Sequence, residues 1–158
     1  MPTAKPTLRQ ALPRDLGVVE DIVRAAYSRY IARIGRKPAP MLDDYAALIA
    51  QGRVTLAEIE GAAEAIVVLI PEADTMLLDN IAVAPAFQGQ GLGRYLLAHA
   101  ETEAVKTGFC AIRLYTHEAM HENIALYKRV GYVETHRAEE KGMHRIYMRK
   151  ELGAEPIP

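Results

Sequence analysis

The amino-acid sequence predicts an α/β domain of the α+β type, in which a central sheet of six to seven strands is flanked by about four helices. Two observations lead to this fold class. Apolar residues recur with helical spacing in four segments, and as alternating or continuous runs in seven others. Each half-apolar element must bury its stripe against another element, which produces layers of helices and sheet. A chain of 158 residues suits one such domain, so we expect a single domain over residues 1–158 with its core from about 7 to 150.

The predicted elements, in chain order, are strand 7–11, helix 16–34, helix 42–50, strand 53–60, strand 62–70, strand 76–83, a glycine cluster that opens a long helix within 87–109, strand 110–116, helix 121–130, strand 132–136 and strand 144–149.

Residues that favour caps and turns bound the elements of the first half. The strand over 7–11 rests on a weak alternation, and Asp15 after it is expected to cap the next helix. That helix carries apolar residues at the i, i+3, i+4 spacing and ends at Gly35. Gly52 closes the second helix, and the short connection at Gly61 between two apolar runs indicates a hairpin.

In the second half, a glycine cluster separates a strand from a long amphipathic helix. The strand over 76–83 ends before Pro85, and the C-terminal cap of the helix is expected at Gly108. Gly131 stops the short helix that follows the next strand. The last two strands flank a polar turn over 139–142.

Charge and cysteine content narrow the function classes. Lys and Arg total 19, and Asp and Glu total 20, so the formal net charge is -1. Such a chain has no surplus of positive charge with which to coat nucleic acid or an anionic membrane. The single cysteine, Cys110, excludes an intramolecular disulfide and a cysteine-rich zinc site; it begins an apolar strand and is expected in the core. No apolar run approaches the ~20 residues of a membrane span, and we expect a cytoplasmic protein.

The most informative segment joins the strand over 76–83 to the helix after it. From Val83 it reads Val-Ala-Pro-Ala-Phe-Gln-Gly-Gln-Gly-Leu-Gly-Arg. Free N–H groups and the positive end of the dipole at a helix start attract an anion such as a pyrophosphate, and glycine allows the backbone to approach it closely. A dinucleotide fingerprint fails because Arg94 and Leu96 stand where it needs glycine, and a P-loop fails because no Lys-Ser/Thr pair follows. A tight turn without a ligand is the alternative reading.

The Gln-x-x-Gly-x-Gly pattern over 88–93 resembles the acetyl-CoA pyrophosphate loop of the GNAT family of N-acetyltransferases. A second segment, Asn-Ile-Ala-Leu-Tyr-Lys-Arg-Val-Gly-Tyr over 123–132, is similar to that family's Asn-x-Ala-x-x-Leu-Tyr-x-x-x-Gly-Tyr/Phe pattern, with a shorter gap after the asparagine. The motifs stand in the expected order, and the resemblance covers nearly the whole chain. It implies the family's mixed, mostly antiparallel sheet and an acetyl-CoA-dependent N-acetyltransferase without a metal.

The resemblance also implies roles for individual residues. The cofactor-binding residues it implies are Ile81, Ala82, Val83, Gln88, Gly89, Gln90, Gly91, Leu92, Gly93, Arg94, Asn123 and Tyr127. Strand N–H groups, where the strand splays from its neighbour, would hold the pantetheine arm and the developing oxyanion. Tyr127 stands where the family places the acid that protonates the leaving thiolate. The alternatives are a core aromatic for Tyr127 and an N-cap of the short helix for Asn123.

The group that deprotonates the amine stays open at this point. Asp79, the second expected catalytic residue, interrupts an apolar strand, and a buried carboxylate needs a partner. It is either a base or amine anchor, or a structural acid bonded to loop amides. His117 is a proton relay or a loop histidine, and ordered water is a third route. His121, His136 and His144 lack metal-ligand spacing and are expected at the surface.

The acceptor side carries no recognisable substrate code. The resemblance implies Tyr27, Tyr30, Asp79, Tyr115 and His117 as substrate-binding residues. Tyr115 stands where ribosomal-protein N-terminal acetyltransferases of this fold often have a glutamate. We therefore expect a small-molecule amine or amino-acid derivative that attacks acetyl-CoA directly in a ternary complex. A protein N terminus or lysine is one alternative, and a non-catalytic acetyl-CoA-binding or interaction protein is another. We expect no nucleic-acid or membrane partner, and a monomer or homodimer.

Overall fold

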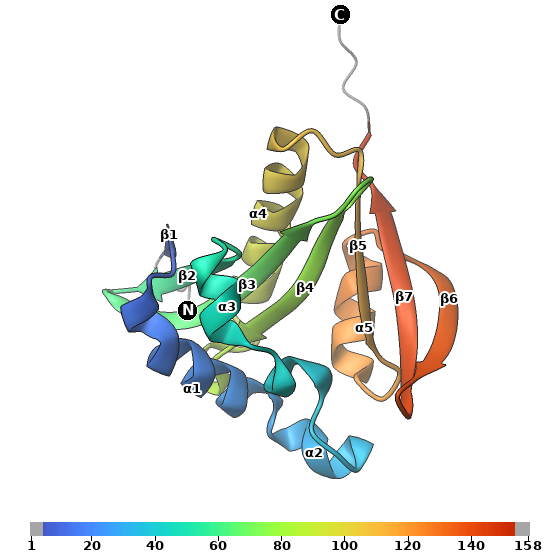
Figure 1. Ribbon diagram of the computed structural model, residues 1–158, viewed down its shortest axis with the longest axis horizontal. Helices are drawn as coiled ribbons and strands as arrows, with labels where there is room; N and C mark the ends of the chain where they lie inside the picture. Colours follow the sequence, from blue (N-terminus) through green and yellow to red (C-terminus); the bar gives the residue numbers. More distant parts are fainter. Residues whose placement is uncertain (1–4, 154–158) are drawn as a thin grey trace, which may run out of the picture. The chain divides into compact units, whose positions relative to one another are not determined.

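The computed structural model describes residues 5–153, which form seven strands and five α-helices (Figure 1). The strands are β1 (Thr7–Gln10), β2 (Val54–Ile59), β3 (Ala62–Pro71), β4 (Met76–Val83), β5 (Ala111–His117), β6 (Val133–Glu140) and β7 (Met143–Glu151). The helices are α1 (Leu16–Tyr27), α2 (Arg29–Ile34), α3 (Tyr45–Ala50), α4 (Leu92–Lys106) and α5 (His121–Arg129).

The strands form one sheet in the order β1-β2-β3-β4-β5-β7-β6. The β4–β5 pair is parallel, and the β1–β2, β2–β3, β5–β7 and β6–β7 pairs are antiparallel. The predicted mixed, mostly antiparallel sheet is therefore confirmed. By contact density the chain divides into two compact units. Within the described residues, the first holds residues 5–69 and the segment Asn80–Leu96, and the second holds Ile70–Asp79 and residues 97–153.

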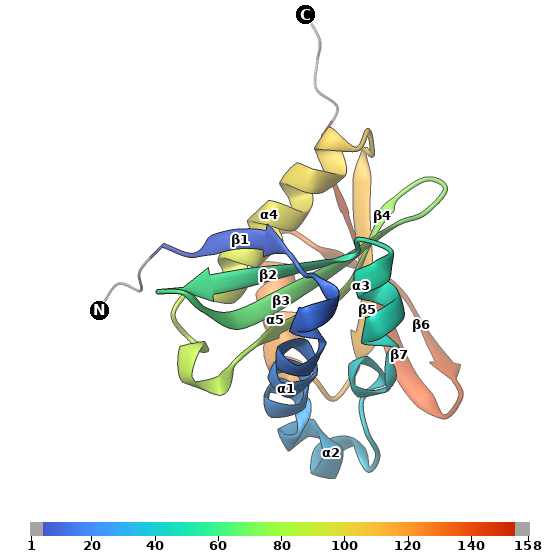
Figure 2. The same cartoon turned by 60° about the vertical axis from the view of Figure 1, so that its left-hand side comes forward.

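The first unit contains the β1–β2–β3 ribbon and the helices α1 to α3 (Figure 2). The predicted hairpin between β2 and β3 is confirmed, and it turns through Glu60 and Gly61, both with positive φ (53° and 87°). Two consecutive left-handed residues match the twist of a tight hairpin. Apolar side chains of α1 and of the ribbon form the core of this unit: Val19, Ile22, Val23, Ala26, Val54, Leu56, Ala57, Ile66, Val67 and Val68.

The helix predicted over 16–34 is divided at Ser28, which is why the structure has five helices where about four were expected. The Ser28 hydroxyl donates to the Arg24 carbonyl, which also accepts the Ser28 N–H at 3.0 Å, and such a side-chain bond is associated with bends in helices. In the next turn the Ile31 N–H donates to the Ser28 carbonyl at 3.1 Å, a spacing of three residues instead of four. The second predicted helix also starts later, at Tyr45, because the Asp44 carboxylate caps it by accepting from the Ala47 N–H at 3.1 Å.

Asp15 does stand at the start of α1, but its carboxylate does not cap that helix. It accepts from the Leu12 N–H at 2.7 Å and from both terminal nitrogens of Arg9 at 2.9 Å. These bonds hold the pKa of Asp15 down at about 2. The carboxylate therefore fixes the chain between β1 and α1.

The second unit is built on the neighbouring strands β5, β7 and β6 (Figure 1). Alternation along β7 places Ile146, Met148 and Lys150 on one face and Arg145 and Tyr147 on the other. The β6–β7 turn is shorter than predicted, because Glu139 and Glu140 belong to β6. The chain reverses at Lys141 and Gly142 alone, with φ of 53° and 79°.

Candidate active site

The turn after β4 is braced by two glutamine side chains. A 3₁₀ turn at Pro85–Phe87 follows the end of β4 at Val83. The Gln88 Nε2 donates to the Val83 carbonyl at 2.9 Å, and the Gln90 Nε2 donates to the Ala86 carbonyl at 3.1 Å. The Gln88 side chain thus ties the turn to the end of β4. The motif alone does not indicate this structural role.

The glycines of this turn differ in what they do. Gly89 and Gly91 have φ of +79° and +89°, a region that costs a residue with a Cβ about 1–2 kcal/mol. No atom lies within 4 Å of the place a Cβ would occupy at either position, so this side of the backbone is open to a ligand. Gly93 is already the second residue of α4. The reading as a plain turn accounts for the first two glycines and leaves Gly93 unexplained.

Helix α4 begins immediately after the turn and presents its N-terminus there. The Tyr95 N–H donates to the Gly91 carbonyl at 2.9 Å. The N–H groups of Leu92, Gly93 and Arg94 therefore precede the helical ladder. Arg94 is exposed and adds positive charge at this end of the helix. The open glycine backbone, the helix N-terminus and the arginine together fit the pyrophosphate of acetyl-CoA.

In the adjoining part of β4, a buried hydrogen-bond network fixes the backbone. Asn80, 4% exposed, accepts from the Tyr27 hydroxyl at 2.5 Å and donates to the Tyr45 hydroxyl at 2.8 Å. The Tyr27 hydroxyl also lies 2.8 Å from the Ile81 carbonyl, and the Tyr45 hydroxyl donates to the Pro40 carbonyl at 2.6 Å. The tyrosines of α1 and α3 thus hold the strand at the residues to which the resemblance assigns the thioester.

This network bears on two of the predicted substrate-binding residues. The Tyr27 hydroxyl is used on β4, and its ring is 6% exposed. Tyr30 is 2% exposed, and its hydroxyl accepts from the exposed Arg29 at 2.8 Å. A role of either ring in binding an acceptor stays a prediction. The sequence analysis did not single out Tyr45. The apolar residues that follow it indicate a buried helix, but not a hydrogen bond to Asn80.

The ladder between β4 and β5 is short. It pairs Met76 with Ile112 and Leu77 with Arg113, and among the described residues no pair follows for Leu78 or Asp79. Arg113 is fixed beside these pairs by two bonds to the Glu72 carboxylate, at 2.7 and 2.9 Å, which lower the pKa of Glu72. The predicted splay requires that β4 separate from β5 before its own end, and the short ladder agrees with this.

Asp79 lies two residues beyond Leu77, the last β4 residue that pairs with β5. It is half-buried in β4, and it has interactions within the protein. Because side chains alternate along a strand, Asp79 faces away from the side on which Asn80 meets Tyr27 and Tyr45. Its role as base or amine anchor stays a prediction.

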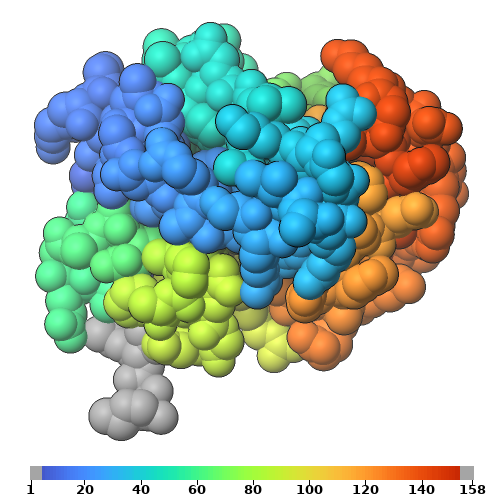
Figure 3. Space-filling model, turned by 90° about the horizontal axis from the view of Figure 1, so that it is seen from below, coloured from blue at the N-terminus to red at the C-terminus, as the bar shows by residue number. Residues whose placement is uncertain are grey.

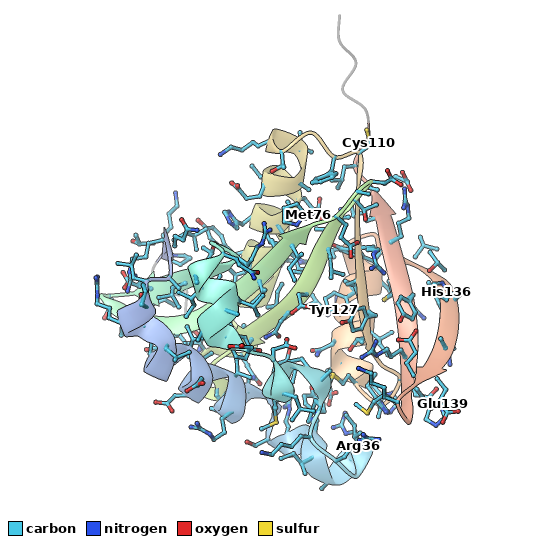
Figure 4. The ribbon with its side chains drawn as sticks, viewed as in Figure 1. Arg36, Met76, Cys110, Tyr127, His136 and Glu139 are labelled. Carbon is cyan, nitrogen blue, oxygen red and sulfur yellow. The ribbon has the colours of Figure 1, made fainter. Side chains whose placement is uncertain are left out.

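Tyr127 lies on α5 in the second unit (Figure 4). Its ring packs edge-on against Tyr132, with ring centres 5.8 Å apart, and its carbonyl accepts from the Tyr132 N–H at 3.0 Å. The Tyr132 hydroxyl is buried without a hydrogen-bond partner among the described residues, and burial raises its pKa. Backbone and ring contacts therefore hold Tyr127 in place. The role of its hydroxyl as the acid stays a prediction.

The end of α5 is clamped by a lysine that the sequence analysis missed. The Lys150 ammonium on β7 donates to the Val130 carbonyl at 2.8 Å and to both Glu101 oxygens on α4 at 2.8 and 3.0 Å. A cation at a helix C-terminus is favourable. Gly131 has a φ of +107°, and a Cβ there would lie 3.1 Å from the Lys150 side chain. Glycine is thus favoured at this position of the second motif by its backbone conformation, and a Cβ there would press against the Lys150 side chain.

Asn123 lies in the first turn of α5 and does not cap it. The N-cap position is Met120, so the alternative reading of Asn123 as an N-cap is wrong. The Asn123 amide nitrogen lies 3.8 Å from the Met120 sulfur, a weak contact. A role in cofactor binding stays a prediction.

Tyr115 joins an aromatic row across three strands. The cross-strand register places it beside Tyr147, with ring centres 5.5 Å apart, and His136 stacks on Tyr147 at 4.3 Å. The Arg145 guanidinium lies 4.3 Å from the Tyr115 ring centre and donates to Glu140, which also accepts from the Tyr147 hydroxyl. Where related enzymes often have a glutamate, this chain has a half-buried aromatic and cationic surface.

His117 has one ring nitrogen already occupied. The Ala119 N–H donates to its Nδ1 at 3.0 Å, and partial burial lowers the pKa of the ring. The neutral ring must therefore carry its proton on Nε2, which makes that nitrogen a donor. The predicted surface positions of His121, His136 and His144 are confirmed by their exposure.

Cys110 is exposed, and its predicted place in the core is wrong. It precedes the first ladder pair of β5, Ala111 with Glu151, so it lies outside the apolar part of the strand. Across residues 5–153, no three His, Cys, Asp or Glu side chains are grouped as metal ligands.

The family model described as the acetyltransferase (GNAT) family matches residues 19–132. This stretch contains both the glycine turn and the segment with Tyr127. The chain belongs to the GNAT family of acetyltransferases. The resemblance inferred from the two motifs is thereby confirmed. None of the helices within the described residues is long and apolar enough to cross a membrane.

Comparison with individual members shows local sequence similarity and a shared fold. The [ribosomal protein bS18]-alanine N-acetyltransferase of Escherichia coli K12 is 43% identical over 61 residues, which cover 39% of this chain and 41% of that protein. The chain thus spans about two fifths of the length of the curated relatives it matches. The crystal structure of the E. coli ribosomal-protein-S18-alanine N-acetyltransferase is 22% identical, with a TM-score of 0.71 and coverage of 96% of both chains.

A second structural neighbour contains the cofactor. The PaiA N-acetyltransferase of Thermoplasma acidophilum, in complex with coenzyme A, has a TM-score of 0.78 at 17% identity and covers 92% of this chain and 98% of its own. At these identities the structural likeness shows the fold alone. Fold and family are thus established.

Proposed function

We propose that this GNAT acetyltransferase transfers the acetyl group of acetyl-CoA directly to an α-amine, and that the amine is the N terminus of a peptide or protein. The observation that carries the cofactor part is the turn after β4. Its left-handed Gly89 and Gly91 have an open side and lead into the N-terminus of α4. Such a backbone binds a pyrophosphate without a basic protein around it.

In the proposed reaction, a carbon–nitrogen bond forms between the amine and the thioester carbonyl carbon, and the carbon–sulfur bond breaks. N–H groups of residues 81–83 stabilise the charge on the carbonyl oxygen. The amine loses a proton to solvent or a base, and the Tyr127 hydroxyl donates a proton to the departing thiolate. The products are an amide and the free thiol of coenzyme A.

The site offers few side chains that could deprotonate an amine, which favours an acceptor with a low pKa such as an α-amine. An α-amino group has a pKa of about 7.7–8.0 and a lysine side chain one of about 10.4. Near neutral pH, an α-amine is therefore free for attack several hundred times more often than a lysine. In this chain, the position that often holds a glutamate is Tyr115, and His117 has its Nδ1 occupied. Asp79 or ordered water is left to accept the proton.

A protein N terminus is favoured over a small molecule by the local similarity to the ribosomal-protein acetyltransferase of E. coli. A small amino-acid derivative is the second candidate, and the tyrosine at position 115 favours it. Both acceptors present an α-amine, so they differ in what surrounds that amine. The acceptor is therefore to be identified by a panel.

The test is a thiol-release assay with acetyl-CoA and four acceptors: a peptide with a free N terminus, an N-blocked peptide with a lysine, an amino-acid amide and a polyamine. We expect the free N terminus to give the highest kcat/KM. Tyr127→Phe should lower kcat about tenfold or more with unchanged acetyl-CoA affinity. Tyr132→Phe is the matched control, since it removes a neighbouring buried hydroxyl that has no hydrogen-bond partner within residues 5–153.

The outcomes separate the candidates. Preference for the lysine peptide or the polyamine would overturn the argument from amine pKa, and preference for the amino-acid amide would select the second candidate. Equal activity of Tyr127→Phe and Tyr132→Phe would refute the acid role. Tight acetyl-CoA binding without thiol release from any acceptor would indicate a non-catalytic binding protein.

A further inference from the structure

We propose that the arginines of α2 bind an acidic group on the acceptor, so that this enzyme prefers peptides with a carboxylate or phosphate side chain about three to five residues from the acetylated amine. The proposal names the acceptor class for the site described above and rests on the proposed function. Its evidence is a local charge surplus, a fixed pair of guanidinium groups and a contact path from this pair to β4.

Positive charge gathers in α2 and the loop after it. Residues 29–42 contain Arg29, Arg33, Arg36 and Lys37 and no acidic residue. All four basic residues are exposed; Arg36 is labelled in Figure 4, and the segment lies at the surface in Figure 3. In a chain whose net charge is -1, this is a local surplus. A local field of one sign raises the concentration of oppositely charged ligands.

Two of these arginines are held on one buried ring. The guanidinium carbons of Arg29 and Arg33 lie 4.8 and 4.9 Å from the ring centre of Tyr30, and an Arg29 nitrogen donates to the Tyr30 hydroxyl at 2.8 Å. Like charges four residues apart destabilise a helix, and the ring offsets this by attracting both cations. The result is a pair of planar donors in fixed positions, which suits the two-oxygen geometry of a carboxylate or phosphate.

The pair is connected to the strand of the proposed thioester site. The Tyr30 ring centre lies 6.2 Å from that of Tyr27, and the Tyr27 hydroxyl lies 2.8 Å from the Ile81 carbonyl. An extended peptide advances about 3.3–3.6 Å per residue. This path sets an upper limit on the separation, so a peptide with its amine near Ile81 reaches the guanidinium groups within about five residues.

Nearby acids do not remove the surplus. Asp43 and Asp44 follow the basic segment, and Asp44 uses its carboxylate to cap α3. Arg33 and Arg36 have further interactions within the protein. With both aspartates included, residues 29–44 still carry two more positive than negative charges, from four basic and two acidic residues. An acidic peptide is thus the ligand that complements this surface.

The test uses peptides with a free N-terminal alanine and one variable position, either the third, fourth or fifth. That position carries glutamate, phosphoserine, glutamine or lysine. Thiol release gives kcat and KM, and fluorescence anisotropy of labelled peptides gives binding without turnover. The variants are Arg29→Gln/Arg33→Gln, the charge-conserving Arg29→Lys/Arg33→Lys, and Arg14→Gln as an exposed control on another segment of the same unit.

We expect the wild type to prefer the acidic peptides over the glutamine peptide by about five- to tenfold in KM and Kd, with little change in kcat. The preference should shrink with added salt, disappear in Arg29→Gln/Arg33→Gln, survive in part in the lysine variant and persist in Arg14→Gln. Phosphoserine and glutamate peptides distinguish a phosphorylated acceptor from a plain acidic one.

Equal affinity of the wild type for glutamate, glutamine and lysine peptides would overturn the proposal, as would a preference that the double glutamine variant retains. Stronger competition by a uridine oligonucleotide than by the acidic peptide would assign the surface to RNA instead. If no peptide is acetylated, the proposed function fails, and the anisotropy series still decides whether this surface selects acidic peptides.

Discussion

Removing the Tyr27 hydroxyl should weaken the hold of α1 on β4. In Tyr27→Phe, the Asn80 amide oxygen and the Ile81 carbonyl lose the donor that lies 2.5 and 2.8 Å from them. One hydroxyl proton serves both acceptors, so the loss corresponds to one buried hydrogen bond rather than two. Leaving a buried acceptor unsatisfied costs about 1–3 kcal/mol. For a chain of this size, this lowers the melting temperature by roughly 2–12 °C.

The matched control is Tyr30→Phe, one turn further along the chain. Tyr30 is as deeply buried as Tyr27, but its hydroxyl accepts from the exposed Arg29 side chain, which water can serve instead. We expect this variant to lose less stability than Tyr27→Phe. Both variants keep the aromatic ring, so the difference between them isolates the contact with β4.

Chemical denaturation of the wild type and both variants measures the free energies of unfolding. In the same preparations, the KM for acetyl-CoA should rise in Tyr27→Phe and stay unchanged in Tyr30→Phe, because only the former loosens the backbone at Ile81. Equal stability of the two variants would refute the reasoning. So would a Tyr27→Phe protein that loses stability and keeps the acetyl-CoA KM of the wild type.

Three further predictions concern the turn, the N-terminal ion pair and the α5 clamp. Gly91→Ala should raise the acetyl-CoA KM about tenfold, since a Cβ at φ +89° is strained and faces the open side; Gly61→Ala, with φ +87° in the β2–β3 hairpin, has the same strain and should leave KM unchanged. Asp15 has a pKa of about 2 in the folded chain and about 3.9 in the unfolded chain, so its bonds to Arg9 and Leu12 stabilise above pH 4, and this contribution is lost as pH falls toward 2. Asp15→Asn should therefore cost about 1–2 kcal/mol at pH 6 and little at pH 2 in urea unfolding; a pH-independent cost would contradict this. Lys150→Met should lose about 1–2 kcal/mol in thermal unfolding, while Lys106→Met, which breaks only an exposed pair with Glu103, should lose less than about 0.5; equal losses would rule out the clamp.

Much of the fold follows from local sequence, because spacing and turn residues act over a few positions. The apolar run over 76–83 and the glycines at 89 and 91 predict a strand and a left-handed turn by themselves. The break at Ser28 does not follow from the apolar spacing, since it coincides with a hydroxyl that bonds to the Arg24 carbonyl. The prediction for Cys110 was wrong because the apolar composition indicates a strand but not the residue at which its pairing begins. The first pair of β5 is formed by Ala111, so Cys110 lies just outside the strand.

One part of the candidate site could be predicted from local sequence, and another part could not. The glycine turn is contiguous in sequence, and its motif can be read directly. The bonds from Tyr27 and Tyr45 to Asn80 join residues 53 and 35 positions apart, and Lys150 reaches Glu101 over 49 positions. No sequence period indicates such pairs, because tertiary packing alone brings them together. The aromatic row of Tyr115, Tyr147 and His136 likewise depends on strand register.

The central claim is direct transfer of acetyl from acetyl-CoA to an α-amine with Tyr127 as the acid. The most direct measurement follows a free-N-terminal peptide and acetyl-CoA in one reaction, with thiol release and peptide mass recorded together. The account predicts equimolar thiol and α-acetylated peptide for the wild type and for Tyr132→Phe, and a rate at least about tenfold lower for Tyr127→Phe. Thiol release without acetylated peptide, or a Tyr127→Phe rate equal to that of the wild type, would contradict it.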